Sequence, residues 1–230
     1  MLDFKYVDVA CIKDGLLGVF DGWELDGQLF PNEEDHPQEF DRRYKTYCGD
    51  DKPNKIFISS QNVAMVQHRI PVAGGFSVHV KFVPNPKPCN VIARLPNGHY
   101  SLRNWGRALN CSFSMIYPER VRVRELTVGE REYTGVAAQV RRSPILGQCA
   151  KRGMKDYVEF RAGNGLDPKK MGYSFQMCGV ATATTKKLEV PLGCGNSVVR
   201  LVSSGDFYNS VDFEFAILEP GESMISACTP

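Results

Sequence analysis

Eight cysteines are the residues of this 230-residue chain whose type and spacing most directly suggest chemistry. No two of them form a Cys-x-x-Cys pair, the spacing typical of zinc ribbons and thioredoxin-like redox sites. An even number at wide spacings favours disulfide bonds, which persist in oxidising compartments. The alternative is eight reduced thiols in a cytosolic protein, which would be vulnerable to oxidation. Spacing alone does not choose a pairing among Cys11, Cys48, Cys89, Cys111, Cys149, Cys178, Cys194 and Cys228.

The tripeptide Asn110-Cys111-Ser112 is the only N-glycosylation acceptor in the chain. Alone it is a weak pattern, but beside the cysteines it supports an extracellular location. Because neighbours in a strand face opposite sides, we expect Asn110 to point to solvent while Cys111 is buried.

Catalytic patterns are missing from the sequence. The four histidines are scattered, with no His-Glu-x-x-His frame, and no Gly-x-Ser-x-Gly motif occurs. Gly163-Asn164-Gly165 is followed by Leu-Asp-Pro rather than a helix start, so it indicates a turn and not a phosphate loop. We therefore expect a protein that is not an enzyme, with no cofactor and no metal.

Composition and charge exclude other classes. Hydrophobic residues make up 43% of the chain and charged residues 23%, with a net charge of +2, so nothing demands a nucleic-acid or membrane partner. No apolar run approaches the roughly 18 residues of a membrane helix. Residues 1–9 alternate in polarity like a strand and do not resemble a signal peptide, which predicts a chain truncated at its N-terminus.

Short alternating segments bounded by Gly, Pro, Asn or Asp recur throughout, and no helical periodicity lasts three turns. Such a pattern predicts an all-β sandwich or barrel. The clearest segments are 18–20, 63–66, 76–80, 112–117, 121–128, 157–160, 197–202 and 211–217.

A proline-rich stretch, residues 84–88, predicts a linker, because proline lacks the N–H of a central strand. The same order of features appears on both sides of it: a cysteine, an acidic residue with a strand, a Cys-Gly pair, an Asn with a strand, and a final alternating strand. We predict a first domain over 1–83, a second over 89–219 and a tail over 220–230.

This order resembles the CUB domain, an extracellular β-sandwich (jelly roll). The resemblance implies two CUB-like domains, the first incomplete at its N-terminus because it contains only one cysteine pair. If so, apolar residues near Leu2, Phe4 and Val19 should be exposed. Asp14 and Asp21 lie where many CUB domains bind calcium, but turn capping is the favoured interpretation.

Longer strings resemble the corticotropin-releasing-factor-binding protein family across nearly the whole chain; only the segment 131–142 matches poorly. The resemblance implies the disulfides Cys11–Cys48, Cys89–Cys111, Cys149–Cys178 and Cys194–Cys228. The strings include Phe20-Asp21-Gly22-Trp23, Asp35-His36-Pro37, Ser59-Ser60-Gln61-Asn62-Val63, Cys89-Asn90-Val91-Ile92, Gly165-Leu166-Asp167-Pro168 and Val198-Val199-Arg200-Leu201.

The family implies a secreted protein that sequesters corticotropin-releasing-factor-like (diuretic-hormone-like) peptides and keeps them from their receptors. The alternative is an extracellular adhesion or protein-interaction module. Trp23, Phe30 and Trp105 lie in or beside turns and are the aromatic candidates for peptide contact. Arg120, Arg122 and Arg124 should share one face of a strand, where a solvated surface is favoured over a basic binding patch.

Overall fold

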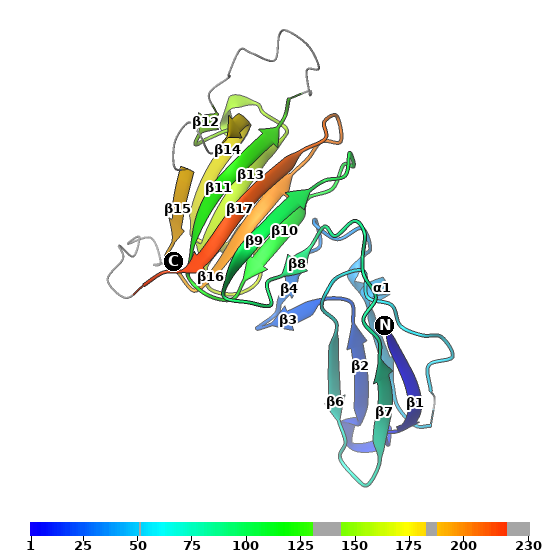
Figure 1. Cartoon of the computed structure of the whole chain (residues 1–230). Coiled ribbons are helices and arrows are strands. Elements are labelled where there is room, and N and C mark those ends of the chain that lie inside the picture. Colours follow the sequence, from blue (N-terminus) through cyan, green and yellow to red (C-terminus); the bar gives the residue numbers. More distant parts are fainter. Residues whose placement is uncertain (51, 131–143, 183–187, 220–230) are drawn as a thin grey trace. The chain divides into compact units, whose positions relative to one another are not determined.

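The computed structural model describes residues 1–50, 52–130, 144–182 and 188–219 (Figure 1). The prediction of an all-β fold is confirmed, because strands dominate and the described helices have only three or four residues. The segment 131–142, which matches the family poorly, lies outside the described residues. The chain divides into two compact units, 1–86 and 87–230, and the division falls within the stretch predicted as a linker.

Unit 1 is a small sandwich of two antiparallel sheets. One sheet has the order β5-β2-β6 and the other pairs β1 with β7. Their bounds are β1 Leu2–Asp8, β2 Leu16–Phe20, β5 Tyr44–Tyr47, β6 Met65–Arg69 and β7 Gly75–Val80. The polarity alternation of β1 places Leu2 and Phe4 in the core with Leu17 and Val19 of β2. A hairpin, β3 (Trp23–Leu25) and β4 (Gln28–Phe30), and a short helix, α1 (Phe40–Arg43), precede β5.

Unit 2 is a larger sandwich with the strand order β8-β10-β16-β13-β14-β11-β17-β9, in which β12 also pairs with β14 and β15 with β11. The long strand β14 joins the two halves, pairing with β13 at one end and β11 at the other. The bounds are β8 Val91–Ile92, β9 Asn97–Arg103, β10 Cys111–Met115, β11 Glu119–Val128, β12 Ile145–Leu146, β13 Tyr157–Gly163, β14 Tyr173–Thr182, β15 Leu188–Leu192, β16 Asn196–Val202 and β17 Ser210–Ile217.

The core of unit 2 is closed from both sides. Phe113 of β10 contacts Phe213 and Phe215 of β17, with ring centroids 5.4 and 5.1 Å apart, and Tyr100 of β9 at 4.4 Å. On the outer face of β13, the segment after Gly163 folds back, burying Leu166 and Met171. These side chains are separate from the main core.

The repeat predicted from the sequence has a structural counterpart. Strands β1, β2, β5, β6 and β7 of unit 1 correspond in order and pairing to β11, β13, β14, β16 and β17 of unit 2. The disulfides Cys11–Cys48 and Cys149–Cys178 join equivalent positions, with Cα atoms 5.1 and 6.3 Å apart. The two units are therefore two copies of one pattern.

Unit 2 has strands with no counterpart in the described part of unit 1. There β9 covers the outer edge of β17 and β10 that of β16, whereas no described strand pairs with the outer edge of β6 or β7. Our expectation of an exposed apolar face near Leu2, Phe4 and Val19 was wrong: they are 7%, 2% and 0% exposed. They are buried because β1 and β2 lie away from the open edges.

Three of the four disulfides implied by the family resemblance are present. The third, Cys89–Cys111, brings its Cα atoms to 4.5 Å and fastens the segment before β8 to the start of β10. Cys194 is also disulfide-bonded. The expected Cys194–Cys228 pair involves Cys228, which lies outside the described residues.

Candidate functional site

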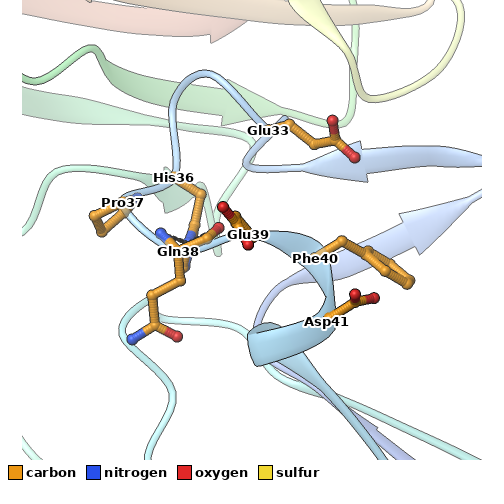
Figure 2. Close-up of a pocket in the computed structure, with 7 residues that line it drawn as sticks. All are labelled: Glu33, His36, Pro37, Gln38, Glu39, Phe40 and Asp41. Carbon is orange, nitrogen blue, oxygen red and sulfur yellow. Dashed lines mark hydrogen bonds between the residues drawn. The ribbon is translucent and has the colours of Figure 1, made fainter.

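Unit 1 contains a cavity of about 470 Å³ in the segment between β4 and β5 (Figure 2). Its wall carries three exposed carboxylates, those of Glu33, Glu39 and Asp41, and none of them forms an ion pair with a described residue. Because like charges accumulate there without compensation, the cavity attracts a cationic group. The remaining lining residues are His36, Pro37, Gln38 and Phe40.

An aromatic stack forms one side of this cavity. Phe40 is 38% exposed and its ring stacks on Tyr44, with centroids 5.8 Å apart and an interplanar angle of 23°. Phe20 packs against Phe40 from below, also at 5.8 Å. A partly exposed ring beside carboxylates suits a lysine or arginine, whose apolar stem packs on the ring while its charge meets the acids.

A buried polar network lies next to the cavity and centres on Asp21. The Asp21 carboxylate accepts hydrogen bonds from the Ser59 hydroxyl at 2.7 Å, the Ser60 hydroxyl at 2.6 Å and the Ser60 N–H at 3.0 Å. His36 lines the cavity and links it to the network: its Nε2 lies 3.0 Å from Ser60 Oγ and 3.5 Å from Asp21 Oδ2. Burial by itself would raise the pKa of Asp21, but these hydrogen bonds outweigh it and lower the pKa.

Arg43, at the end of α1, anchors the helix to the same network. Its side chain is fully buried, and Nε and Nη2 both donate to the backbone carbonyl of Asp21 at 3.1 Å. The guanidinium also lies 4.7 Å from the centre of the Phe20 ring, a cation–π distance. Since α1 carries Phe40 and Asp41, Arg43 fixes part of the cavity wall.

Three of the strings that carry the family resemblance meet in this network, although they are far apart in the chain. Phe20-Asp21-Gly22-Trp23 supplies the carboxylate, Asp35-His36-Pro37 the imidazole, and Ser59-Ser60-Gln61 the hydroxyls. The fold thus gives a structural reason for residues that the sequence presented only as a resemblance.

The aromatic residues predicted for peptide contact fall in both units. Trp23 and Phe30 are cross-strand partners in the β3–β4 hairpin. Trp23 is half-buried, whereas Phe30 is 1% exposed and offers no surface. In unit 2, Trp105 is half-buried; its indole N–H donates to the Pro88 carbonyl at 3.1 Å, and Arg103 lies 6.0 Å from its ring.

The three arginines of β11 do share one face, as predicted. Arg120 and Arg122 both approach Glu189 of β15, at 3.3 and 3.6 Å, and Arg124 pairs with Glu214 of β17. Acidic neighbours therefore compensate their charge, which favours the solvated sheet surface over a basic patch.

The carboxylates considered for calcium are far from forming a site. The Asp14 side chain is 84% exposed and lies 3.6 Å from Arg69, while Asp21 accepts from protein donors as described above. Among the residues that the structure describes, no group of three or more histidines, cysteines or acids could hold a metal ion. No helix in these ranges is long and apolar enough to cross a membrane.

The cavity itself was missed in the sequence. Its signal was available: the segment 33–41 carries Glu33, Glu34, Asp35, Glu39 and Asp41, a local acidic density interrupted by one proline and one aromatic residue. An acidic run usually indicates only a solvated loop, so composition alone does not distinguish the two.

Comparison with known proteins confirms the resemblance found in the sequence. Residues 1–84 match the model of the corticotropin-releasing factor binding protein N-terminal domain, and residues 91–224 match that of the C-terminal domain. The chain is 37% identical to corticotropin-releasing factor-binding protein of Xenopus laevis, over 100% of this chain and 71% of the relative. It is 38% identical to the Homo sapiens protein, over 96% of this chain and 66% of the relative. This chain therefore belongs to the corticotropin-releasing factor-binding protein family.

Proposed function

We propose that this chain binds corticotropin-releasing-factor-like peptides in the extracellular fluid and withholds them from their receptors. The observation that carries the proposal is the family match, which runs through both units and includes the residues of the Asp21 network. A binder that acts at nanomolar hormone concentration must supply about −12 kcal/mol. Rigid frames help to reach such affinity, and disulfides of roughly 2–4 kcal/mol each provide rigidity here.

Within unit 1, the acidic cavity is our proposed contact for a basic side chain of the peptide. Glu39 and Asp41 would meet its charge and Phe40 its apolar stem. Trp23 and Trp105 remain proposed aromatic contacts. Phe30 would act only through packing beneath the hairpin, because its ring is buried.

The direct test is a titration of a labelled corticotropin-releasing-factor-like peptide with the purified chain, followed by fluorescence anisotropy. We expect saturable binding that a scrambled peptide of the same composition does not show. The double variant Glu39→Gln/Asp41→Asn should weaken binding about tenfold, whereas Glu125→Gln, an exposed acid on β11, should have no effect. Equal signals from the native and scrambled peptides would contradict the proposal.

We also propose that the chain acts by binding alone and not as an enzyme. The same peptide should be recovered intact by mass spectrometry after prolonged incubation with the protein. Peptide fragments that appear with the chain, and do not appear with a heat-denatured sample, would show an enzymatic activity instead.

A further inference from the structure

Two strand edges of unit 1 lack the partners that cover the equivalent edges of unit 2. Strand β7 corresponds to β17, whose outer edge pairs with β9 over seven residues. Strand β6 corresponds to β16, whose outer edge pairs with β10 over five residues. In the described part of unit 1, each of these edges is open.

The core side chains on these strands reflect the difference. In unit 2, Phe213 and Phe215 of β17 are 0% and 6% exposed, because Leu102 of β9 and Phe113 of β10 close the core beside them. In unit 1, by contrast, β6 and β7 contain no fully buried residue. The apolar residues Val66, Phe76 and Val78 are only half-buried, and Val80 is 48% exposed.

The backbone at the β7 edge is oriented for pairing. Met1 and Lys81 exchange two hydrogen bonds, at 2.9 and 3.0 Å, and so form a hydrogen-bonded antiparallel pair. The next pair, Leu2 and Val80, must then turn its N–H and C=O groups away from each other. Leu2 does so, bonding to Phe57 on the other side. The polar backbone of Val80 therefore points to the open edge.

We propose that the outer edges of β6 and β7 are a docking surface for two antiparallel strands, equivalent to β10 and β9, with apolar residues at alternate positions facing the core. An unpaired edge beside a half-exposed apolar row is a template for strand addition. This inference does not depend on peptide binding.

The occupant that fits is a segment of the longer family members outside the matched part. In unit 2, β9, β10 and their connection occupy residues 97–115, so a short segment suffices. The match covers 71% of the Xenopus laevis relative and 65% of the Ovis aries relative, which leaves enough chain in each to form such a strand pair.

The test uses the full 230-residue chain, expressed in a secretory host together with either flank of the Xenopus laevis relative: the part before its matched stretch or the part after it. We expect one flank to copurify and to slow hydrogen exchange at the amides of Val78 and Val80 at least about tenfold, with β17 unchanged. If neither flank copurifies, the proposal is overturned.

Two variants give the experiment its control. Val80→Pro removes an N–H that points to the open edge and should abolish capture of the flank. His79→Ala changes an exposed side chain on the same strand and should leave capture intact. Protection of these amides by self-association of the chain alone, or by a corticotropin-releasing-factor-like peptide, would assign the edge to a different occupant and contradict the proposal.

Discussion

The hydroxyl of Ser60 donates a hydrogen bond of 2.6 Å to the carboxylate of Asp21. This contact joins the end of β2 to the segment that precedes β6 in unit 1. Unit 2 uses the same chemistry at the opposite end of its equivalent strand pair, where Asp156 before β13 accepts from Ser204 after β16, also at 2.6 Å. In each unit a buried aspartate holds a loop against the central strands.

Replacing Asp21 by asparagine should destabilise unit 1 by roughly 1–3 kcal/mol, because the amide cannot accept all the hydrogen bonds that the carboxylate receives. The exposed variant Asp14→Asn is the matched control and should change stability little. Urea unfolding, monitored by hydrogen exchange in β2 and β6, measures the difference. Equal stability of the two variants would remove the structural role of the network.

The same carboxylate predicts acid sensitivity of unit 1. The folded-state pKa of Asp21 lies below its ordinary value of 3.8, so the folded state binds this proton less tightly than the unfolded state does. Its stabilisation is present above pH 3.8 and is lost as the pH falls through the folded-state value. Asp21→Asn should therefore flatten the acid limb of the stability curve; an unchanged limb would contradict the assignment.

Glu119 predicts the opposite behaviour for unit 2. Its side chain is fully buried at the start of β11, neither carboxylate oxygen has a hydrogen-bond partner, and burial raises its pKa from 4.5 to about 8. The folded state therefore holds this proton more tightly than the unfolded state. The stability of unit 2 should fall as the pH rises from about 4.5 to about 8, and level off above that.

The variant Glu119→Gln, which cannot ionise, should remove this decline and be more stable than the native chain at pH 9, by roughly 1–3 kcal/mol. Glu125→Gln, an exposed acid on the same strand, is the control. Hydrogen exchange in β11 and β17 across this pH range is the measurement. A native chain whose unit 2 stability does not depend on pH would refute the prediction.

Gly163 should not tolerate a side chain. A Cβ atom there would lie 2.8 Å from the Cα of Met171, whose segment covers the outer face of β13. We expect Gly163→Ala to cost roughly 1–3 kcal/mol, as overpacking does in other cores. Gly75→Ala has open space around it and serves as the control. Thermal unfolding compares the two, and a neutral Gly163→Ala would mean that the covering segment is not tightly packed.

Secretion and glycosylation are predicted together at Asn110. Its side chain is half-buried, with Oδ1 accepting from the Ser203 N–H at a long 3.4 Å, while Ser112 of the acceptor motif is buried. Expression in a secretory host should give a medium-borne protein that loses mass on treatment with a glycan-removing amidase. Asn110→Gln should abolish that loss, and Ser112→Thr should retain it. An unglycosylated secreted chain would rule out this site.

Strand patterning and family strings predicted the all-β fold and the repeat, because alternation in segments such as 121–128 and 211–217 depends only on local sequence. The open edges were foreseen in kind but misplaced. Which strands they involve depends on pairing between β6, β7 and distant segments, and no local pattern contains that information.

The candidate site was harder to predict for a related reason. Asp21, His36 and Ser60 were each quoted for the resemblance, yet their meeting is a property of the fold and not of their spacing. Phe30 shows the converse error. A position beside a turn suggested surface, whereas the hairpin buries its ring.

The most direct test of the account is competition with the hormone receptor. Cells bearing a corticotropin-releasing-factor receptor are exposed to increasing hormone at several fixed concentrations of the purified chain. The account predicts that the response curve shifts to higher hormone concentration as the chain increases, with the maximal response unchanged, because captured hormone is unavailable but the receptor is intact. Superimposed curves at chain concentrations far above that of the hormone would contradict it.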